Sequence, residues 1–409
     1  MKQRKEIVII GAGISGICAA LSCAEEGCNV TLIEKSETIG GNVIQANVGT
    51  ICGAYLRTEQ STPNLVGNSF VQQFITDLLS FLKLSSPINY HQGLHIIPYD
   101  WEQLNEFLKL KLKAFNNITL QLNTAVTAIN VSQNKIKSIA LNSNEKAVLY
   151  ADEVIDCSGN TVANKLLGLA VISEKKYQSA TQLFRINNIG NITEFALNMR
   201  LKKMVAGNVK WPKSYQSISV SPLSLVKDRV DIKLTLPHLI TDKLDAKALK
   251  KEAEKAVNEV FAEMRQQIDC FKTSRLQKIF PEVGVRVQNR AKGVAILEEN
   301  DVLNISKPKN GIAIGAWPIE YWNPEGKLEL TTFEQDEYYL IPAGCLQSKD
   351  IENLYYAGKN ISASEKAIAS ARVVGTCLQT AFAAGKMASK GINVISELRN
   401  NLMIGDEYI

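Results

Sequence analysis

Histidine and closely spaced cysteine pairs are scarce in this sequence. Only three of its 409 residues are histidines, so a metal centre built on imidazole ligands is not expected. The eight cysteines form no CxxC pair, which argues against a zinc site, a redox dithiol or an iron–sulfur ligand set. Many of them lie in apolar runs, as reduced buried thiols do, and this pattern predicts a cytoplasmic location. The histidines are His91, His95 and His238, the first two in a stretch predicted to be rich in loops.

Long apolar runs and a strongly charged tail are also missing. There is no stretch of 18 apolar residues, and the short polar segment before Ile7 leaves no room for a signal peptide, so neither a transmembrane segment nor a leader is predicted. The net charge of +5 comes from 46 basic and 41 acidic residues spread along the chain. This distribution lacks the footprint of a nucleic-acid-binding protein. The length allows two or three domains with a large core.

The sequence does have a strand, a glycine-rich turn and a helix at its start. The β-branched run Ile7–Ile10 leads directly into the turn, and Glu34 follows the last glycine of the turn after 18 positions. This order and spacing are typical of a dinucleotide-binding βαβ unit, whose glycines permit a tight turn, close approach to a pyrophosphate and close helix packing. The helix start offers free N–H groups to phosphates, and Glu34 is expected to accept hydrogen bonds from ribose hydroxyls. The turn reads Gly11-Ala12-Gly13-Ile14-Ser15-Gly16.

Periodicity divides the rest of the chain into an α/β pattern and a long interruption. Between about 175 and 345, strand-like alternation surrounds one long helical pattern, which indicates an inserted second domain, and the α/β pattern resumes near Asn353. Helices are predicted at 69–84, 101–115, 246–270 and about 370–390. Strands are predicted at 118–122, 125–131, 135–141, 147–150, 153–156, 217–220 and 230–236.

The glycine-rich turn belongs to a longer pattern that closes at Gly40-Gly41. With Ala20, Gly27, Val30 and Glu34, it resembles the fingerprint of FAD-binding proteins of the glutathione-reductase type. Later blocks resemble the broad family of FAD-dependent oxidoreductases. They are Val154–Asn160, Gly284-Val285-Arg286 with Arg290 and Gly293, Tyr339–Pro342, and the segment from Asn353 to Gly385.

This resemblance implies an α/β fold, with a Rossmann-type FAD-binding domain built from discontinuous segments and an inserted α+β substrate domain. The expected division assigns residues 1–165 and 345–395 to the FAD-binding domain, 166–344 to the substrate or cap domain and 396–409 to a C-terminal tail. A second GxGxxG-bearing βαβ unit is not visible, so a separate NAD(P)H domain is not indicated.

The resemblance also carries FAD-binding roles to individual positions. The helix that opens near Val373 would direct N–H groups at the N1–C2=O edge of the flavin, and Val126 would meet the adenine through its backbone. Gly358 would lie at the diphosphate or the ribityl chain. The positions expected to contact FAD are Gly11, Ala12, Gly13, Ile14, Ser15, Gly16, Glu34, Lys35, Gly40, Gly41, Asn42, Val126, Ser158, Gly159, Gly358, Lys359, Val373, Gly375 and Thr376.

Four residues are candidates for the chemistry. Arg372, just before the flavin-facing turn, is suited to bind a substrate carboxylate or to neutralise reduced flavin, the alternative being a salt bridge to a neighbouring acid. Cys52 lies in a loop expected near the isoalloxazine, as a thiol facing flavin or substrate or as a small buried residue. Tyr339 is expected on the substrate side or in the aromatic core. Glu365 stands where many relatives have histidine.

Three further basic residues are notable. One of them differs from the usual flavoprotein pattern, and the location of the other two is left open by the sequence. Lys359 stands where many two-electron flavoproteins have an acid that holds a ribityl hydroxyl. Arg286 and Arg290 are four residues apart and share a face in a strand or a helix, so they are expected either at the domain junction or in surface pairs.

The reaction implied by these features is a two-electron, hydride oxidation of a small organic metabolite at flavin N5, such as an amine or an alcohol within a biosynthetic pathway. A reductase of an activated double bond, an FAD monooxygenase and an electron-transferring flavoprotein subunit are the alternatives. Oxygen, a quinone or a partner protein is the expected electron acceptor, and no metal is expected. The sequence leaves the substrate and the oligomeric state open.

Overall fold

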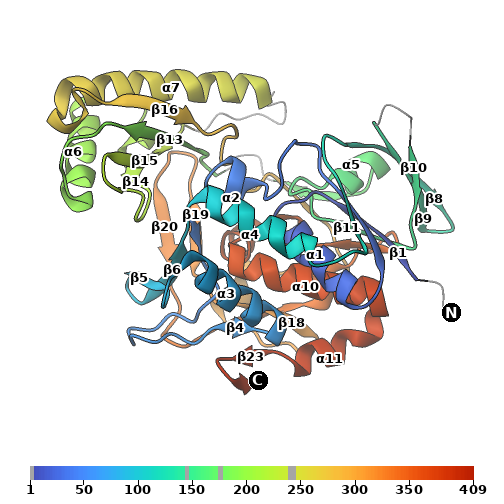
Figure 1. Ribbon diagram of the computed structural model, residues 1–409. Helices are drawn as coiled ribbons and strands as arrows, with labels where there is room; N and C mark the ends of the chain where they lie inside the picture. Colours follow the sequence, from blue (N-terminus) through green and yellow to red (C-terminus); the bar gives the residue numbers. More distant parts are fainter. Residues whose placement is uncertain (1–3, 143–146, 174–177, 238–245) are drawn as a thin grey trace.

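The computed structural model describes residues 4–142, 147–173, 178–237 and 246–409. Figure 1 shows a large body that carries both ends of the chain and a smaller lobe, formed around residues 181–279, at its upper left. The two parts have separate hydrophobic cores, because one buried cluster draws only on residues 184–283. Buried residues from 287 to 346 join the core of the body instead.

A sheet of five parallel strands forms the centre of the body, in the order β22-β11-β1-β2-β7. Because β22 comes from the last part of the chain and pairs with β11, distant segments complete one sheet. The predicted α/β fold, with a Rossmann-type sheet built from discontinuous segments, is therefore confirmed. The strands are β1 (Glu6–Ile10), β2 (Asn29–Ile33), β7 (Ile118–Gln121), β11 (Glu153–Asp156) and β22 (Leu354–Tyr356).

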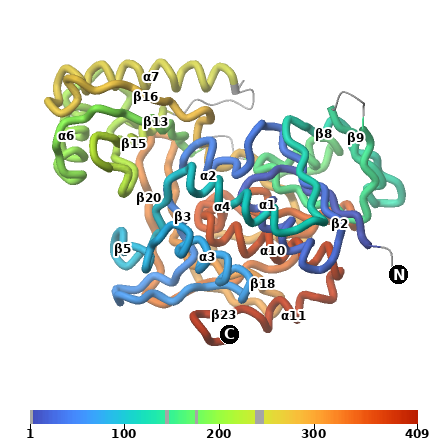
Figure 2. Tube along the Cα trace, viewed as in Figure 1, coloured from blue at the N-terminus to red at the C-terminus, as the bar shows by residue number. Residues whose placement is uncertain are grey.

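Alternation along β1 explains the two layers that cover this sheet. Ile7 and Ile9 join the core beneath helices α1 (Ile14–Glu25) and α10 (Val374–Lys390). Figure 2 shows these two helices, from opposite ends of the sequence, lying side by side. Val8 and Ile10 point to the other face, where an antiparallel sheet packs. That sheet consists of β8 (Val126–Ser132), β9 (Lys135–Leu141) and β10 (Val148–Tyr150).

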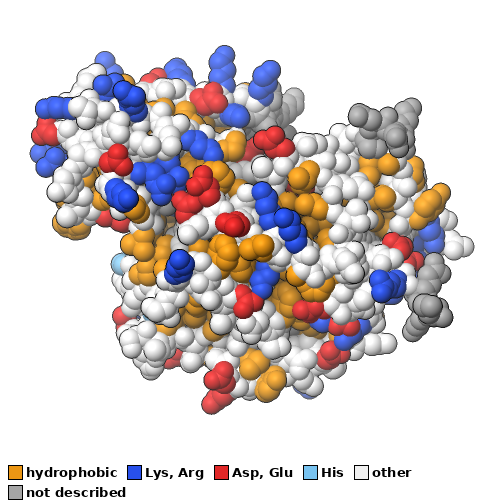
Figure 3. Space-filling view, in the orientation of Figure 1, with side chains coloured by type: hydrophobic (Ala, Val, Ile, Leu, Met, Phe, Trp, Pro, Cys, Tyr) orange, Lys and Arg blue, Asp and Glu red, His pale blue; other side chains and the backbone are white. Residues whose placement is uncertain are grey.

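The lobe is a four-stranded antiparallel sheet with two helices on one face. Phe184 and Ile232 point toward the helices, and Arg185 and Asp231, which are paired across the two central strands, point to the opposite face. The elements are β13 (Thr181–Asn187), β14 (Ser219–Val220), β15 (Arg229–Thr235), β16 (Arg275–Ile279), α6 (Glu194–Gly207) and α7 (Ala246–Gln267). Lysine and arginine side chains line the outer edge of the lobe in Figure 3, over α7.

The remaining elements surround the central sheet and join the lobe to it. Helices are α2 (Asn42–Gln45), α3 (Ser69–Leu82), α4 (Trp101–Lys113), α5 (Val162–Leu167), α8 (Glu299–Leu303), α9 (Glu365–Ala371) and α11 (Ile395–Asn400). Strands are β3 (Thr50–Ile51), β4 (Val66–Gly67), β5 (Ile88–His91), β6 (Leu94–Pro98), β12 (Val171–Ser173), β17 (Asn289–Ala291), β18 (Gly311–Gly315), β19 (Ile319–Trp322), β20 (Leu328–Thr331), β21 (Tyr339–Pro342), β23 (Met403–Ile404) and β24 (Glu407–Tyr408).

Two sequence expectations need correction. His91 and His95 lie on the paired strands β5 and β6 rather than in a loop. The side chain of His95 is buried, with 4% of its surface exposed. The helix predicted at about 370–390 is α10, which begins at Val374 rather than near 370; residues 370 and 371 belong to the preceding helix α9, and the two helices meet at 94°. In the described part of the chain no single helix is long and apolar enough to cross a membrane, and α9 with α10 satisfies that test only as this bent pair.

Candidate active site

Two glycine-rich turns meet beyond the carboxyl ends of β1 and β2. Gly11 has a positive φ of 96°, and its amide donates to the carbonyl oxygen of Ile33 at 2.7 Å. The Gly40 amide donates to the Ala12 carbonyl oxygen at 2.7 Å, which brings the second turn onto the first. An added Cβ at Gly13 would find no atom nearer than Gly41 Cα at 3.9 Å. The backbone at Gly13 is therefore open to a close-approaching group.

Glu34 stands at the end of β2 with its carboxylate directed at this turn. Its Oε2 accepts a hydrogen bond from the Ala12 amide at 2.8 Å, and its Oε1 accepts one from Ser36 at 3.0 Å. The Thr124 amide donates to the Glu34 carbonyl oxygen at 2.9 Å, and this contact places Val126, two residues further on, near the same sheet end. Each carboxylate oxygen retains acceptor capacity for a ligand hydroxyl.

The turns after β11 and β22 close over the start of α1. A Cβ at Gly358 would lie 2.2 Å from Ser15 Oγ, and one at Gly159 would lie 3.0 Å from Lys359 Cε. Lys359 Nζ donates to the Val285 carbonyl oxygen at 3.4 Å, and Asn42 donates to that same oxygen at 3.2 Å. Burial lowers the pKa of Lys359 to about 8. The lysine ammonium thus lies among the glycine turns.

The start of α10 contacts the loop that carries Cys52. The Gly375 amide donates to the Cys52 carbonyl oxygen at 2.8 Å, so this N–H is already satisfied by the protein. A Cβ at Gly375 would lie 2.3 Å from the carbonyl carbon of Gly53, and only glycine permits this approach. Thr376 Oγ1 is buried and has no hydrogen-bond partner in the described structure. Burial, followed by the charge of Glu320, raises the pKa of the Cys52 thiol to about 12.

Glu320, on β19, is the acid at the centre of a charged cluster beside Cys52. Its two carboxylate oxygens accept hydrogen bonds from the indole nitrogens of Trp317, at 3.0 Å, and Trp322, at 2.7 Å. Burial alone would raise the pKa of Glu320, but Arg372, the Trp322 indole and Lys233 outweigh burial and hold it below its usual value. The carboxylate is therefore ionised and fixed in position.

Arg372 joins this cluster from the turn between α9 and α10. Its Nη2 donates to the Glu320 carbonyl oxygen at 3.0 Å and to Gln178 Oε1 at 3.3 Å. Its Nε is buried without a hydrogen-bond partner in the described structure. Arg372 and Cys52, both predicted from sequence, are brought together here, because Cys52 packs in one cluster with Trp317, the Trp317 indole binds Glu320, and Arg372 binds the Glu320 carbonyl oxygen.

Two more cations flank Trp322. The Arg286 guanidinium carbon lies 4.7 Å from the centre of the Trp322 ring, and Lys233 Nζ lies 5.5 Å from it. Burial lowers the pKa of Arg286, with a further contribution from Arg372. Burial also lowers the pKa of Lys233, and Arg286 adds to the effect. Both contacts are cation–π geometries, and Arg286 is buried whereas Lys233 is partly buried.

The comparison with known families agrees with this arrangement. Residues 6–397 match the family described as FAD dependent oxidoreductase. The chain belongs to the FAD-dependent oxidoreductase family. The D-amino acid dehydrogenase of Helicobacter pylori is 34% identical over 99 residues, which are 24% of this chain and 22% of that protein. The NADH:fumarate oxidoreductase of Klebsiella pneumoniae is 43% identical over 44 residues, 11% of this chain and 5% of that protein. The chain therefore matches only a minor part of the length of these relatives.

Solved structures of flavoenzymes align with the chain over most of its length. L-proline dehydrogenase from P. horikoshii has 15% identity and a TM-score of 0.43, with 97% of this chain and 94% of that chain covered. p-Nitrophenol 4-monooxygenase PnpA from Pseudomonas putida DLL-E4 has 10% identity and a TM-score of 0.48, with 97% and 82% covered.

The residues of this family member fit FAD. The open backbone at Gly13 and the α1 start suit a pyrophosphate, and Glu34 lies where the second strand ends, as a ribose contact requires. The buried, unpartnered Thr376 Oγ1 lies at the start of α10, beside the Cys52 loop. FAD supplies a two-electron acceptor when bound, and these residues are the ones that would hold it.

Glu365 and Tyr339, the other two candidates from sequence, lie outside the glycine-rich turns. Glu365 Oε1 accepts a hydrogen bond from the Tyr321 hydroxyl at 2.8 Å, at the start of α9. Tyr339 is fully buried, its hydroxyl lies 2.8 Å from Ser370 Oγ, and burial raises its pKa. Ser370 Oγ donates in turn to the Trp317 carbonyl oxygen at 2.5 Å. Tyr339 therefore supports the backbone of a cluster residue from the core side.

Sequence reasoning missed Lys233, Glu320, Trp322 and Gln178. One signal was present: Arg229, Asp231, Lys233 and Thr235 alternate with apolar residues along β15, so these four polar residues lie on one face. Polar residues on that face of a buried strand indicate a site or a charged contact. The partners across the face come from distant segments and gave no local signal.

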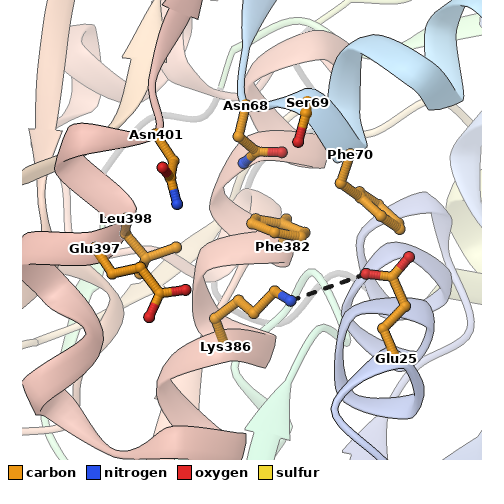
Figure 4. Close-up of a pocket in the computed structure, with 9 residues that line it drawn as sticks. All are labelled: Glu25, Asn68, Ser69, Phe70, Phe382, Lys386, Glu397, Leu398 and Asn401. Atoms are coloured by element: carbon orange, nitrogen blue, oxygen red, sulfur yellow. Dashed lines mark ion pairs between the residues drawn. The ribbon is translucent and has the colours of Figure 1, made fainter. Parts of the chain in front are cut away.

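A surface pocket lies at the other end of α10 and contains none of the predicted site residues. Figure 4 shows the stacked rings of Phe70 and Phe382, with centroids 4.9 Å apart, and the Lys386–Glu25 ion pair. Lys386 is 11 residues after Gly375, about 16 Å along the helix axis. The residues that line this surface pocket are Glu25, Asn68, Ser69, Phe70, Phe382, Lys386, Glu397, Leu398 and Asn401.

Proposed function

We propose that this FAD-dependent oxidoreductase oxidises a small organic metabolite, such as an amine or an alcohol, by hydride transfer to flavin N5, in a biosynthetic pathway. The supporting observation is the cluster of Arg372, Glu320 and Trp317 beside Cys52 and the start of α10, where the family resemblance expects the isoalloxazine. The substrate C–H bond breaks and both electrons leave as hydride. The N–H or O–H proton passes to water, and the product is an imine or a carbonyl compound. Oxygen, a quinone or a partner protein then takes the electrons.

The described side chains orient the substrate rather than carry the electrons. The Trp317 and Trp322 indoles fix the Glu320 carboxylate, so the cluster is rigid before substrate binds. Arg372 reaches from the α9–α10 turn to the backbone of β19 and keeps Nε available for a ligand. We propose a glutathione-reductase-type mode of FAD binding on the Gly13 turn. The eight unpaired cysteines support a reducing, cytoplasmic location.

The test is the absorbance spectrum of the purified protein with a panel of small metabolites, first without oxygen and then with it. FAD, identified by chromatography of the released cofactor, should bleach with one amine or alcohol and not with the matching imine or carbonyl compound. Recovery of colour in oxygen indicates an oxidase, and recovery only with a quinone or protein acceptor indicates a dehydrogenase. Released FMN, or bleaching by NADH followed by reduction of an activated double bond, would contradict the proposal.

A further inference from the structure

We infer that the substrate of this site is a carboxylate, and that Arg286 and Lys233 bind its carboxylate group against the face of Trp322. This inference rests on the proposed function, because it names the chemical class of the molecule oxidised there. It assigns a specificity role to two residues outside the FAD-binding turns. Lys233 comes from the lobe strand β15, and Trp322 comes from β19 of the body.

The first observation is that Arg286 is built into the interior without a complete set of partners. Its residue is 9% exposed, and its Nη1 is buried with no hydrogen-bond partner in the described structure. The guanidinium carbon lies 4.7 Å from the Trp322 ring centre, a stacking contact that leaves the edge of the guanidinium free. A buried, unpartnered N–H on a cation costs folding free energy unless a ligand accepts from it.

The second observation is an excess of positive charge. Arg286, Lys233 and Arg372 contribute to one electrostatic cluster in which Glu320 is the acid. In the described part of the chain, no carboxylate oxygen lies within 4.0 Å of a nitrogen of these three cations. Three cations against one acid leave an excess of two positive charges in this cluster.

The third observation is that both carboxylate oxygens of Glu320 are already hydrogen-bonded to tryptophan side chains. Both of its oxygens accept indole N–H groups, so the carboxylate stabilises the cations through space without filling their hydrogen-bonding positions. Burial and mutual repulsion lower the pKa values of Arg286 and Lys233, and a bound anion would oppose both effects. The planar guanidinium edge matches a carboxylate, with which it forms two parallel hydrogen bonds.

The position of this cluster determines which part of the substrate it holds. Cys52, Trp317 and Val373 pack in one hydrophobic cluster, and Trp317 donates to Glu320, whose carbonyl oxygen accepts from Arg372. The charged cluster therefore lies beside the loop that contacts the start of α10. The proposed function places the reacting carbon on that side. A substrate with its carboxylate near the amine or alcohol carbon would therefore reach the cations and the reacting position together.

The experiment titrates the FAD-loaded protein with succinate, with its neutral analogue succinamide and with inorganic phosphate. Binding is read from the absorbance of bound FAD and from tryptophan fluorescence, neither of which requires turnover. Succinate should bind at least 10-fold more tightly than succinamide. Arg286→Gln and Lys233→Gln should each weaken succinate binding about 10-fold or more, with the FAD content unchanged. Arg275→Gln, an exposed arginine on β16, is the matched control and should bind as the unaltered protein does.

The outcomes separate this inference from the proposed function. Equal binding of succinate and succinamide, tighter binding of phosphate than succinate, or unchanged binding in both variants would overturn the carboxylate site. Reduction of the flavin by a neutral amine with no effect of Arg286→Gln on its KM would also overturn it and leave the proposed function standing. Absence of FAD would contradict the proposed function alone, because tryptophan fluorescence still measures succinate binding.

Discussion

A Cβ placed on Gly16 would lie 1.8 Å from the carbonyl oxygen of Gly11. The first helix therefore packs onto the turn before it at a distance that no side chain permits. Gly13, three residues earlier, has φ −67° and open space at the same position. The two glycines thus serve different needs, helix packing at Gly16 and ligand approach at Gly13.

We expect Gly13→Ala to keep the fold and lose FAD, and Gly16→Ala to lose the fold. The alanine methyl at position 13 would occupy the space of the pyrophosphate, so FAD affinity should fall at least 10-fold at an unchanged melting temperature of the FAD-free protein. At position 16 the clash is with backbone, and we expect destabilisation by about 4 kcal/mol or more. FAD titration and thermal unfolding measure both effects.

Gly207→Ala is the matched control for these two variants. Gly207 is exposed at the end of α6 with nothing within 4 Å of an added Cβ, so alanine should be neutral or stabilise by about 0.5–1 kcal/mol. Full FAD affinity in Gly13→Ala would show that the pyrophosphate lies elsewhere.

Replacement of Glu34 should weaken FAD binding without abolishing folding. Glu34→Ala removes the acceptor of the Ala12 amide, with a cost of about 1–3 kcal/mol, and removes the proposed ribose contact. We expect a 10- to 100-fold weaker Kd for FAD, measured by quenching of flavin fluorescence on reconstitution. Glu34→Gln retains one carbonyl acceptor, so its Kd for FAD should lie between those of Glu34→Ala and the unaltered protein. Glu37→Ala, three residues away and exposed, should leave the Kd unchanged, and an equal loss there would discount the ribose contact.

Lys359 should make FAD binding depend on pH. Burial, followed by Arg372 and Lys35, lowers its pKa from 10.5 to about 8, and only Cys377 opposes this. Between pH 8 and 10.5 the unfolded chain holds a proton that the folded FAD-free protein lacks, so through this window the lysine makes stability rise with pH. Below pH 8 the buried charge is destabilising. A bound diphosphate would favour the protonated lysine, so FAD affinity should fall as pH rises above about 8.

Lys359→Met separates this contribution from other titrations. The variant should bind FAD more weakly at pH 7, and its Kd should change less between pH 7 and 9 than that of the unaltered protein. Reconstitution at several pH values measures this. Parallel pH profiles in the two proteins would mean that Lys359 does not contact the diphosphate.

The local secondary structure could be predicted from the sequence, and the contacts between distant segments could not. The apolar run of β1, the glycine turn and the spacing to Glu34 depend on neighbours in sequence, and the parallel sheet confirmed them. The start of α10 near Val373 was expected from the resemblance, but the separate helix α9 before it was not, because no proline marks the break and the Cys52 carbonyl that accepts from Gly375 lies over 300 residues away. The contact between Lys233 and Trp322 depends on how the lobe packs against the body. The alternation of residues along a strand does not predict that packing.

The Arg185–Asp231 pair should anchor the lobe. Arg185 donates to both oxygens of Asp231, at 2.6 and 2.9 Å, and Asn47 of the body donates to the same carboxylate at 3.0 Å. Asp231→Ala leaves the buried guanidinium with only the longer contact to Asp100, at 3.4 Å, so we expect a loss of about 3 kcal/mol in the free energy of unfolding. Hydrogen exchange should show the loss first in β13 and β15.

An exposed pair in the same lobe provides the comparison. Lys272 and Asp269 are 2.7 Å apart with both side chains mostly exposed, so Lys272→Ala should leave the free energy of unfolding nearly unchanged. Similar losses in Asp231→Ala and Lys272→Ala would show that the buried pair does not hold the lobe.

Arg372 should contribute to the rate of flavin reduction rather than to FAD retention. Its Nη2 is bound to the Glu320 carbonyl oxygen and to Gln178, whereas its buried Nε has no partner in the described structure. We predict that Arg372→Ala costs about 2–4 kcal/mol of transition-state stabilisation, which is a roughly 30- to 900-fold slower reduction in single turnover. Arg372→Lys retains the charge without the planar fork and should recover only part of the rate. Arg200→Ala, exposed on α6, is the control. If both Arg372 variants hold full FAD and reduce it at the unaltered rate, Arg372 is structural, and Glu365 and Tyr339 become the next residues to test.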